Sequence, residues 1–187
     1  MSENVERVLA AIAALSTEER AELLGRLSGS GWQPDRPIQA AMSLTFSTGE
    51  IEGPTDYVIT FDGGAQGNPG PGYGSYALTR VSDGKSDVVR LDFGRSMTNN
   101  EAEYETLIAG LQALIERIEA AGRSPGDFSV EVRGDSALVI HQVQGDWKTK
   151  DDRMRLLRNR VRQLLARFGG YRLTLQDRDE SVRVLGH

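Results

Sequence analysis

Three acidic residues stand at the edges of expected strands and helices, where side chains can act on a ligand. Asp62 follows an apolar strand, Glu103 lies in the first turn of a helix, and Asp135 follows a second strand. If the two strands are neighbours in one sheet, the three carboxylates meet at one end of it. Carboxylates gathered in this way repel one another unless cations neutralise them. Hard oxygen ligands with no His or Cys beside them indicate Mg²⁺ or Mn²⁺, and a pair of such ions can activate a water and stabilise the leaving oxygen of a phosphodiester.

Each carboxylate also has a simpler interpretation. Asp62 precedes glycine, and Asp-Gly is a common turn, whereas Asp135 precedes a helix and can be its N-cap. Acidic residues favour a helix N-terminus through the helix dipole, which explains Glu101 well. It explains Glu103 poorly, because Glu103 borders the apolar face of its helix one turn before Leu107. A carboxylate at that border costs free energy unless it is paired or metal-bound.

The loop after Asp62 is richer in glycine and proline than a hairpin requires. It reads Gly-Asn-Pro-Gly-Pro-Gly over residues 67–72. No Gly-Lys-Ser or Gly-Lys-Thr follows, which excludes a phosphate-binding P-loop. The loop leads into an expected strand and not into a helix, which argues against a dinucleotide-binding fingerprint. The remaining interpretation is a loop whose backbone lies bare to a ligand, and bare amides suit the 2′-hydroxyl and phosphate contacts by which RNA is told from DNA.

The elements that position these residues follow from the pattern of apolar residues and turns. Three strands, a helix, a strand, two helices and a last strand follow one another, which predicts an α/β fold. We expect a mixed five-stranded sheet, begun by a meander and completed by crossover units, with helices on both faces. The expected strands are 57–61, 73–81, 88–93, 128–132 and 171–175, and the expected helices are 100–121, 137–143 and 151–168.

The chain divides into three parts. Residues 1–31 read as a small helical hairpin, residues 32–55 as a linker with several prolines and glycines, and residues 56–187 as the α/β domain. The hairpin has apolar residues at helical spacing and a net charge of −2 over residues 3–26. Its apolar faces are too small to form a core alone. We therefore expect the hairpin to dock on a protein partner or to self-associate.

Composition limits the classes of function. The chain has no cysteine, which excludes disulfides, thiolate metal sites and a cysteine nucleophile and fits a reducing cytoplasm. No apolar run approaches the roughly 18 residues of a membrane helix, and the acidic N-terminus is not a secretory signal. We therefore expect a cytoplasmic protein with no membrane partner. The net charge of −5 argues mildly against a nucleic acid partner, because Lys and Arg are needed to neutralise phosphates.

The last long helix answers that objection. Residues 148–167 hold eight basic residues and two acidic ones, and an excess of one sign favours a phosphate-facing role. Arg155, Arg158 and Arg162 line one flank of its buried stripe. An ordinary solvated helix face remains the alternative, because Arg is a good helix former. Trp147, which precedes Lys148, fits either stacking on a sugar or a place in the core.

The three acidic motifs together resemble the type 1 ribonuclease H family. The resemblance covers about residues 56–185 and rests on Asp-Gly-Gly with Gly-Asn-Pro-Gly-Pro-Gly, on Thr-Asn-Asn with Glu three residues past the second Asn, and on Gly-Asp-Ser. Residues 142–148 look like those of the short-loop bacterial and archaeal members, which lack a basic protrusion. The resemblance implies an endonuclease that uses Mg²⁺ or Mn²⁺, two ions per site, to hydrolyse the RNA strand of an RNA–DNA hybrid with water as nucleophile. The products implied are 5′-phosphate and 3′-hydroxyl ends.

The resemblance also assigns roles to particular residues. Asp62, Glu103 and Asp135 match the catalytic metal ligands of the family. Asn68 and Thr98 match residues that hold a DNA-strand phosphate, and Asn99 matches one that contacts sugars and bases. The full set of expected hybrid contacts is Gly63, Gly64, Ala65, Asn68, Thr98, Asn99, Trp147, Lys148, Arg155, Arg158 and Arg162.

Two features depart from the family pattern. Ala137 stands where many members have Gln, so one polar contact to the hybrid is missing. Members also carry a fourth acidic ligand just after the last strand, but Leu185 falls at that position, and the usual last helix is absent before the chain stops at His187. His187 is the candidate fourth ligand, because an imidazole can bind metal; the acidic residues of 177–180 are further stand-ins or form a solvated turn. The alternative function is a hybrid- or double-stranded RNA-binding module that has lost catalysis with the fourth carboxylate.

Overall fold

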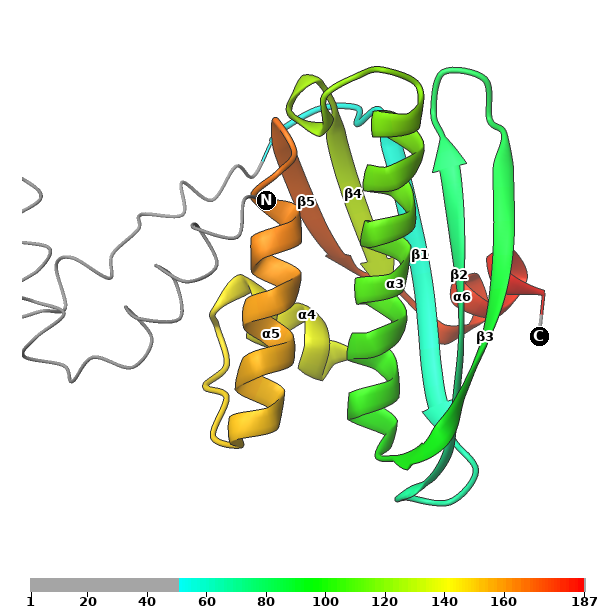
Figure 1. The fold of residues 1–187 in the computed structure, drawn as a ribbon, viewed down its shortest axis with the longest axis vertical. Coiled ribbons are helices and arrows are strands. Elements are labelled where there is room, and N and C mark those ends of the chain that lie inside the picture. Colours follow the sequence, from blue (N-terminus) through cyan, green and yellow to red (C-terminus); the bar gives the residue numbers. More distant parts are fainter. Residues whose placement is uncertain (1–50, 187) are drawn as a thin grey trace, which may run out of the picture. The chain divides into compact units, whose positions relative to one another are not determined.

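A computed structural model describes residues 51–186, and a mixed five-stranded sheet forms their centre (Figure 1). The strands are β1 (Tyr57–Ala65), β2 (Gly70–Arg80), β3 (Ser86–Met97), β4 (Ser129–Gly134) and β5 (Gly170–Leu175), in the order β3-β2-β1-β4-β5. The first three strands pair antiparallel, whereas β1, β4 and β5 run parallel. This confirms the predicted sheet of a meander joined to crossover units. The predicted hairpin over residues 1–31, most of the predicted linker and His187 lie outside the described residues.

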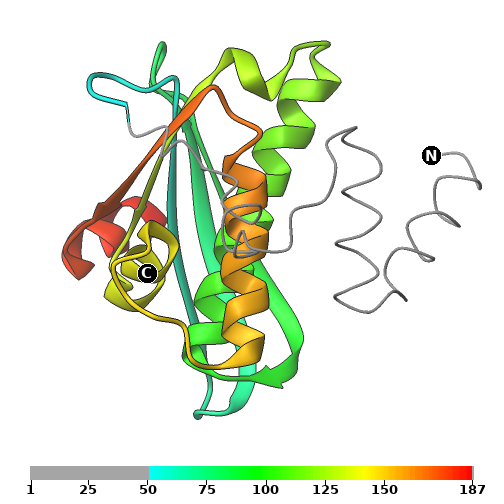
Figure 2. The ribbon, with the colours of Figure 1, turned by 90° about the vertical axis from the view of Figure 1, so that its left-hand side faces the viewer.

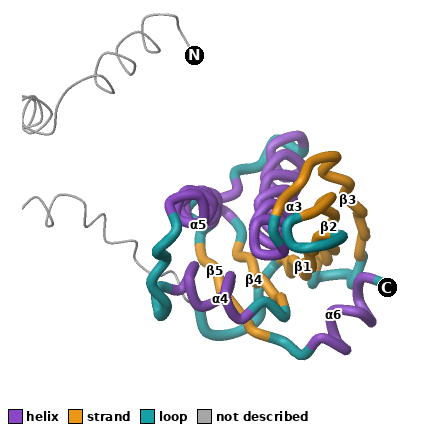
Figure 3. Tube along the Cα trace, turned by 90° about the horizontal axis from the view of Figure 1, so that it is seen from below, coloured by secondary structure: helices purple, strands orange, loops and turns teal. Residues whose placement is uncertain are grey.

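Helices cover both faces of the sheet, as predicted. The α-helices of the described part are α3 (Asn99–Ala120), α4 (Ala137–Gln144), α5 (Asp152–Leu165) and α6 (Arg178–Leu185). Figures 2 and 3 show α3 and α5 together on one side of the sheet and α6 on the other, where α6 packs on β1 and β2. Among residues 51–186, no helix is both long enough and apolar enough to cross a bilayer.

The apolar core lies between the sheet and the pair α3 and α5. Alternate residues of β1 and β4 point into it, as expected for strands buried on that face, and α3 contributes its apolar stripe. Fully buried members are Ile59, Phe61, Tyr104, Leu107, Leu111, Leu114, Val130, Val132, Val161 and Leu165. Burial of this many large side chains fixes the position of α3 on the sheet, and α3 carries Glu103.

β1 runs further than the sequence suggested. The expected strand ended before Asp62, but residues 62–65 stay paired with residues 72–75 of β2. The glycines of this paired segment leave its backbone without side chains and so let α3 pack closely on both strands. A Cβ on Gly74 would lie 1.9 Å from Thr106 Oγ1 in α3, far inside contact distance. The hairpin therefore continues beneath the helix, and only residues 66–69 form the loop.

A helix also follows the last strand, where none was expected. Residues Arg178–Leu185 form α6, so the prediction of a domain without its last helix is wrong. Ser181 and Leu185 are one helical turn apart, and both are buried against the sheet. Gly186 ends the helix in a left-handed conformation with φ of 77°, which glycine adopts readily. The acidic residues 177–180 therefore belong to the start of a packed helix and not to a solvated turn.

Candidate active site

Asp62 lies in β1, and Asp135 directly follows β4, the parallel neighbour of β1. The last paired residues of β1 and β4 are Phe61 and Gly134, and each aspartate is the next residue of its chain segment. β4 ends there, whereas β1 continues to Ala65. We call the place where β1 extends past the end of β4 the notch, and both aspartates lie at it. The predicted meeting of these two residues at one sheet edge agrees with the pairing.

Glu103 reaches the notch from α3 because that helix lies directly on β1. A Cβ built on Gly63 would be 2.6 Å from the carbonyl group of Ala102 and from the backbone nitrogen of Glu103. Any side chain larger than hydrogen at residue 63 would push the helix away. Gly63 is thus the residue whose absence of a side chain allows Glu103 to approach Asp62.

The electrostatics of Glu103 reflect this position. Burial raises its pKa to about 7, the hydrogen bond from Ser136 opposes the rise, and the negative charges of Asp135 and Asp62 add to it. Ser136 Oγ donates to Glu103 Oε2 over 2.5 Å. The Glu103 carboxyl is therefore close enough to Asp62 and Asp135 to feel the charge of both. Positive charge placed among them would favour the ionised form of Glu103.

The helix caps show which of the acidic residues have the simpler role of capping a helix. Ser136, and not Asp135, is the N-cap of α4, because its hydroxyl accepts from the Val139 N–H over 3.3 Å. Glu101 belongs to a capping box with Thr98 at the start of α3. Neither Asp135 nor Glu103 is needed to cap a helix. Asp135 Oδ2 lies 3.7 Å from the Arg178 guanidinium at the start of α6.

The chemistry of the donor set fits a divalent cation, although the side chains do not enclose one as they stand. Within residues 51–186, no three acidic or histidine side chains converge closely enough to surround an ion. Asp62, Glu103 and Asp135 supply carboxylate oxygens, which hard cations such as Mg²⁺ and Mn²⁺ prefer. Mutual repulsion among them is the condition that a cation relieves.

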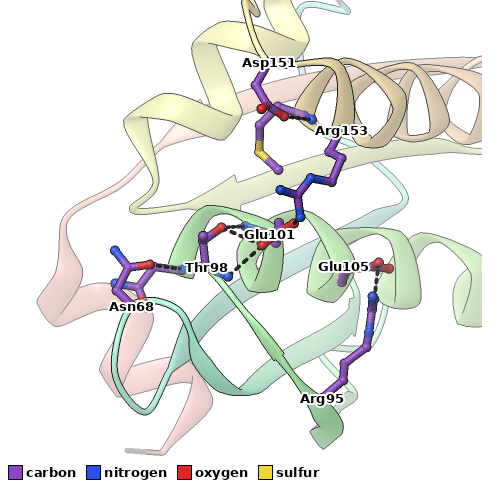
Figure 4. A network of polar contacts seen from close by, with 9 residues as sticks. Asn68, Arg95, Thr98, Glu101, Glu105, Asp151 and Arg153 are labelled. Atoms are coloured by element: carbon purple, nitrogen blue, oxygen red, sulfur yellow. Dashed lines mark hydrogen bonds and ion pairs between the residues drawn. The ribbon is translucent and has the colours of Figure 1, made fainter.

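The start of α3 and the β1–β2 loop are fastened together by side-chain hydrogen bonds. Asn68 Oδ1 accepts from the Asn99 backbone over 3.2 Å, and Asn99 Oδ1 accepts from the Ala65 backbone over 2.9 Å. Thr98 binds Glu101 through its backbone and hydroxyl, and Arg153 of α5 donates to Glu101 over 3.2 Å (Figure 4). Three of the predicted substrate contacts, Asn68, Thr98 and Asn99, therefore lie together on one rim of the site.

Gly64 carries an aromatic neighbour that sequence analysis missed. A Cβ on Gly64 would lie 2.7 Å from the hydroxyl of Tyr73, its pairing partner in β2. The Tyr73 ring therefore lies against the backbone of Gly64 and is about half exposed. An aromatic residue in a glycine-rich strand, opposite a glycine, is the signal that identifies such a contact.

The three arginines chosen on α5 have partners inside the protein. Arg162 donates to the carbonyl oxygen of Val143 at the end of α4 over 2.8 Å, which is a helix-capping contact. Arg158 donates to Thr149 and Asn159, and Arg155 pairs with Asp152. Desolvation and the neighbouring Arg162 charge lower the pKa of Arg158. Arg162 is thus a structural residue, while Arg155 is about half exposed.

Trp147 lies at the surface and not in the core. Its side chain is 48% exposed, and its ring lies 4.8 Å from that of His141 with 30° between the planes. Lys148, next in the chain, is exposed. This removes the core interpretation and leaves Trp147 available to a ligand.

Leu185 is buried near the end of α6. It is 1% exposed in the last turn of α6, whereas Arg178, seven residues earlier, is the residue beside Asp135. The first turn of α6 therefore faces the site, and the residue found there is an arginine, which sequence reasoning overlooked because the helix itself was not expected.

Comparisons with known proteins agree with this architecture. A family model described as "Reverse transcriptase-like" matches residues 60–184. A protein named Ribonuclease HI from Halobacterium salinarum is 39% identical over 124 residues, which are 66% of this chain and 58% of that protein.

Solved structures resemble the described fold as well. The crystal structure of RNase H1 from Halobacterium salinarum superposes with a TM-score of 0.56 and 34% identity, covering 68% of this chain and 90% of that one. The crystal structure of LC11-RNase H1 in complex with an RNA/DNA hybrid superposes with a TM-score of 0.58 and 28% identity, covering 68% of this chain and 90% of that one. Together with the family match and the geometry of the notch, they lead to one assignment. The chain belongs to the reverse transcriptase-like family and has the fold of the type 1 ribonucleases H.

Proposed function

We propose that this protein hydrolyses the RNA strand of RNA–DNA hybrids as a metal-dependent endonuclease. The observation that carries the proposal is the notch beside β1, where Asp62 and Asp135 follow the last paired residues of neighbouring strands and Glu103 approaches across Gly63. A ribonuclease HI relative and a neighbour solved with an RNA/DNA hybrid support the choice of substrate. The aligned part of the chain spans 58% of that relative.

Divalent cations, with Mg²⁺ or Mn²⁺ in two positions, would supply Lewis acidity and an activated water for hydrolysis of the phosphodiester. Asp62, Glu103 and Asp135 would hold them through carboxylate oxygens. The raised pKa of Glu103 supports this assignment, because cations would offset the burial and repulsion that disfavour its charge. Ser136 orients one oxygen of Glu103, so the other is the better placed to reach a cation.

The rim of the site would hold the hybrid. Asn68, Thr98 and Asn99 stand where α3 begins, and a helix N-terminus attracts phosphate through its backbone N–H groups and its dipole. Gly63, Gly64 and Ala65 offer close backbone approach along β1. Trp147, Lys148, Arg155 and Arg158 would extend the contact across α4 and α5, where Arg162 instead supports the helix end. These contacts give sequence-tolerant binding through sugars and phosphates.

The alternative is a hybrid- or double-stranded RNA-binding module without catalysis. It is favoured by one observation: the first turn of α6 presents Arg178 to Asp135. A positively charged side chain, rather than an acidic one, therefore faces Asp135 from that side. The sequence proposes His187 as the fourth ligand. This residue lies outside the described part of the chain, so the proposal stands as made. The two functions differ in whether a bound hybrid is cut.

A set of single variants separates the two functions. Asp62→Asn, Glu103→Gln and Asp135→Asn would each abolish cleavage of a labelled hybrid in Mg²⁺ or Mn²⁺ while retaining hybrid binding. Glu116→Gln, at an exposed position of α3 thirteen residues beyond Glu103, is the matched control and would remain active. Uncut hybrid with wild type under all cation conditions, together with tight binding, would favour the binding module. Full activity in any of the three site variants would contradict the assigned ligands.

A further inference from the structure

Arg178 is a basic residue whose side chain lies beside Asp135, one of the three carboxylates of the site. Its Nη1 lies 3.7 Å from Asp135 Oδ2, and its side chain is 76% exposed whereas that of Asp135 is 14% exposed. The carboxylate is therefore held in the protein, and the guanidinium approaches it from solvent on a long side chain. Such a guanidinium can leave without disturbing the core.

The position of Arg178 is fixed by contacts on both sides of it. The backbone N–H of Gln176 donates to the carbonyl oxygen of Gly134, the residue before Asp135, over 3.0 Å. The Gln176 side chain donates to Ser181 Oγ over 2.8 Å, and Ser181 is a buried residue of α6. The segment that enters α6 is thus bound to the end of β4, and the first turn of the helix must face Asp135.

A second arginine of α6 provides the contrast. Arg183 pairs with Glu180 in its own helix, three residues away. Arg178 instead pairs across elements, with the carboxylate that follows β4. The pairing of Arg178 therefore follows from the tertiary fold, whereas that of Arg183 follows from the helix surface.

We propose that Arg178 is an internal counter-ion of Asp135 that competes with the divalent cation for this carboxylate and so sets the cation affinity of the site. The inference rests on the proposed function, because it assumes that Asp135 holds a cation. A guanidinium near Asp135 repels a divalent cation and occupies one oxygen that the cation would use. Cation binding then requires that Arg178 move outward into solvent.

The expected effect is moderate because the pair is partly exposed. Removing the charge of Arg178 would tighten cation binding by about three- to tenfold, since a unit charge near a surface site contributes on the order of 1 kcal/mol. Arg178→Glu would tighten it further, because an acidic group then faces the cation from the first turn of α6. The ranking of cation affinity is therefore Glu above Ala above Arg at residue 178.

The test is isothermal titration of Mg²⁺ and of Mn²⁺ into the full chain without nucleic acid, for wild type, Arg178→Ala, Arg178→Glu and the control Arg183→Ala. Thermal unfolding with and without each ion provides a second readout. We expect tighter binding and a larger ion-induced rise in Tm for both Arg178 variants, and wild-type values for Arg183→Ala.

Several results would overturn the proposal. Equal cation affinity in wild type and Arg178→Ala, with lower stability in the variant alone, would make the pair a structural fastening of α6. No cation binding in any variant, including Arg178→Glu, would also refute it. Because no hybrid is present, these outcomes are independent of whether wild type cuts RNA: an enzyme active on hybrid with unchanged ion affinity in Arg178→Ala retains the proposed function and loses this inference.

Discussion

Gly63→Ala tests how the fold brings Glu103 to the aspartates. The new Cβ would stand 2.6 Å from the backbone of α3 at Ala102 and Glu103, whereas ordinary contact begins at 3.4 Å. Both partners are backbone, so no flexible side chain can turn aside. The helix must therefore separate from β1 by about 0.8 Å, because a close-packed interior has no free volume to absorb the methyl group.

The separation has two consequences of different size. Overpacking of this kind costs about 1–3 kcal/mol of unfolding free energy. A misplacement of about 1 Å at a catalytic group can lower the rate by about a hundredfold, and Glu103 moves with the helix. The variant should therefore remain folded but lose most of its activity.

Urea unfolding and hybrid cleavage measure the two effects on the same preparation. Gly126→Ala is the matched control, because its added Cβ would meet no atom closer than 3.5 Å and Gly126 precedes β4, whereas Asp135 follows the other end of that strand; it should change stability by less than about 0.5 kcal/mol. Wild-type stability and activity in Gly63→Ala would refute the role assigned to the glycine.

The remaining predictions concern charge. Asp62→Asn should abolish cleavage while leaving the protein as stable as wild type or more so, because one repelling carboxylate is removed; urea unfolding without cations measures this, and a clear loss of stability would contradict it. The raised pKa of Glu103 means that the folded state keeps a proton that the unfolded state releases, so cation-free stability should fall as pH rises from about 4.5 through about 7, by up to about 3 kcal/mol. Glu103→Gln should flatten that dependence, and a wild-type curve equally flat would argue against the burial of this carboxyl. Arg155→Ala and Arg158→Ala should each reduce the log–log salt slope of hybrid binding by about 1. Arg162→Ala should chiefly lower the free energy of unfolding, by about 1–2 kcal/mol. Wild-type salt slopes in all three variants would mean that α5 presents an ordinary solvated face.

The sequence predicted the parts of the site that depend on local pattern. Strand periodicity predicted β1 and β4 as neighbouring strands and so put Asp62 beside Asp135, although β1 continues past the predicted end to Ala65. Helical periodicity separated Glu103, at the border of the apolar stripe, from Glu101, which caps the helix. Both inferences need only the spacing of apolar residues and the rule that adjacent parallel strands end at the same edge.

The parts that depend on distant contacts were missed. The role of Gly63 follows from the approach of α3, some forty residues later in the chain. The helical capping role of Arg162 follows from how α5 lies against α4. Arg178 was overlooked because α6 was not predicted, and its importance appears only when the first turn of α6 is seen beside Asp135. Spacing along the chain carries no information on these pairings.

Cleavage of four labelled duplexes is the sharpest test of whether this protein is a metal-dependent ribonuclease that cuts RNA in hybrids. An RNA–DNA hybrid labelled on either strand, a double-stranded RNA and a double-stranded DNA of the same sequence are incubated with wild type in Mg²⁺, in Mn²⁺ and with chelator. We expect internal cuts in the RNA strand of the hybrid alone, with 5′-phosphate ends, only when a divalent cation is present. Hybrid that is bound but never cut, or cuts that persist in chelator, would contradict this expectation.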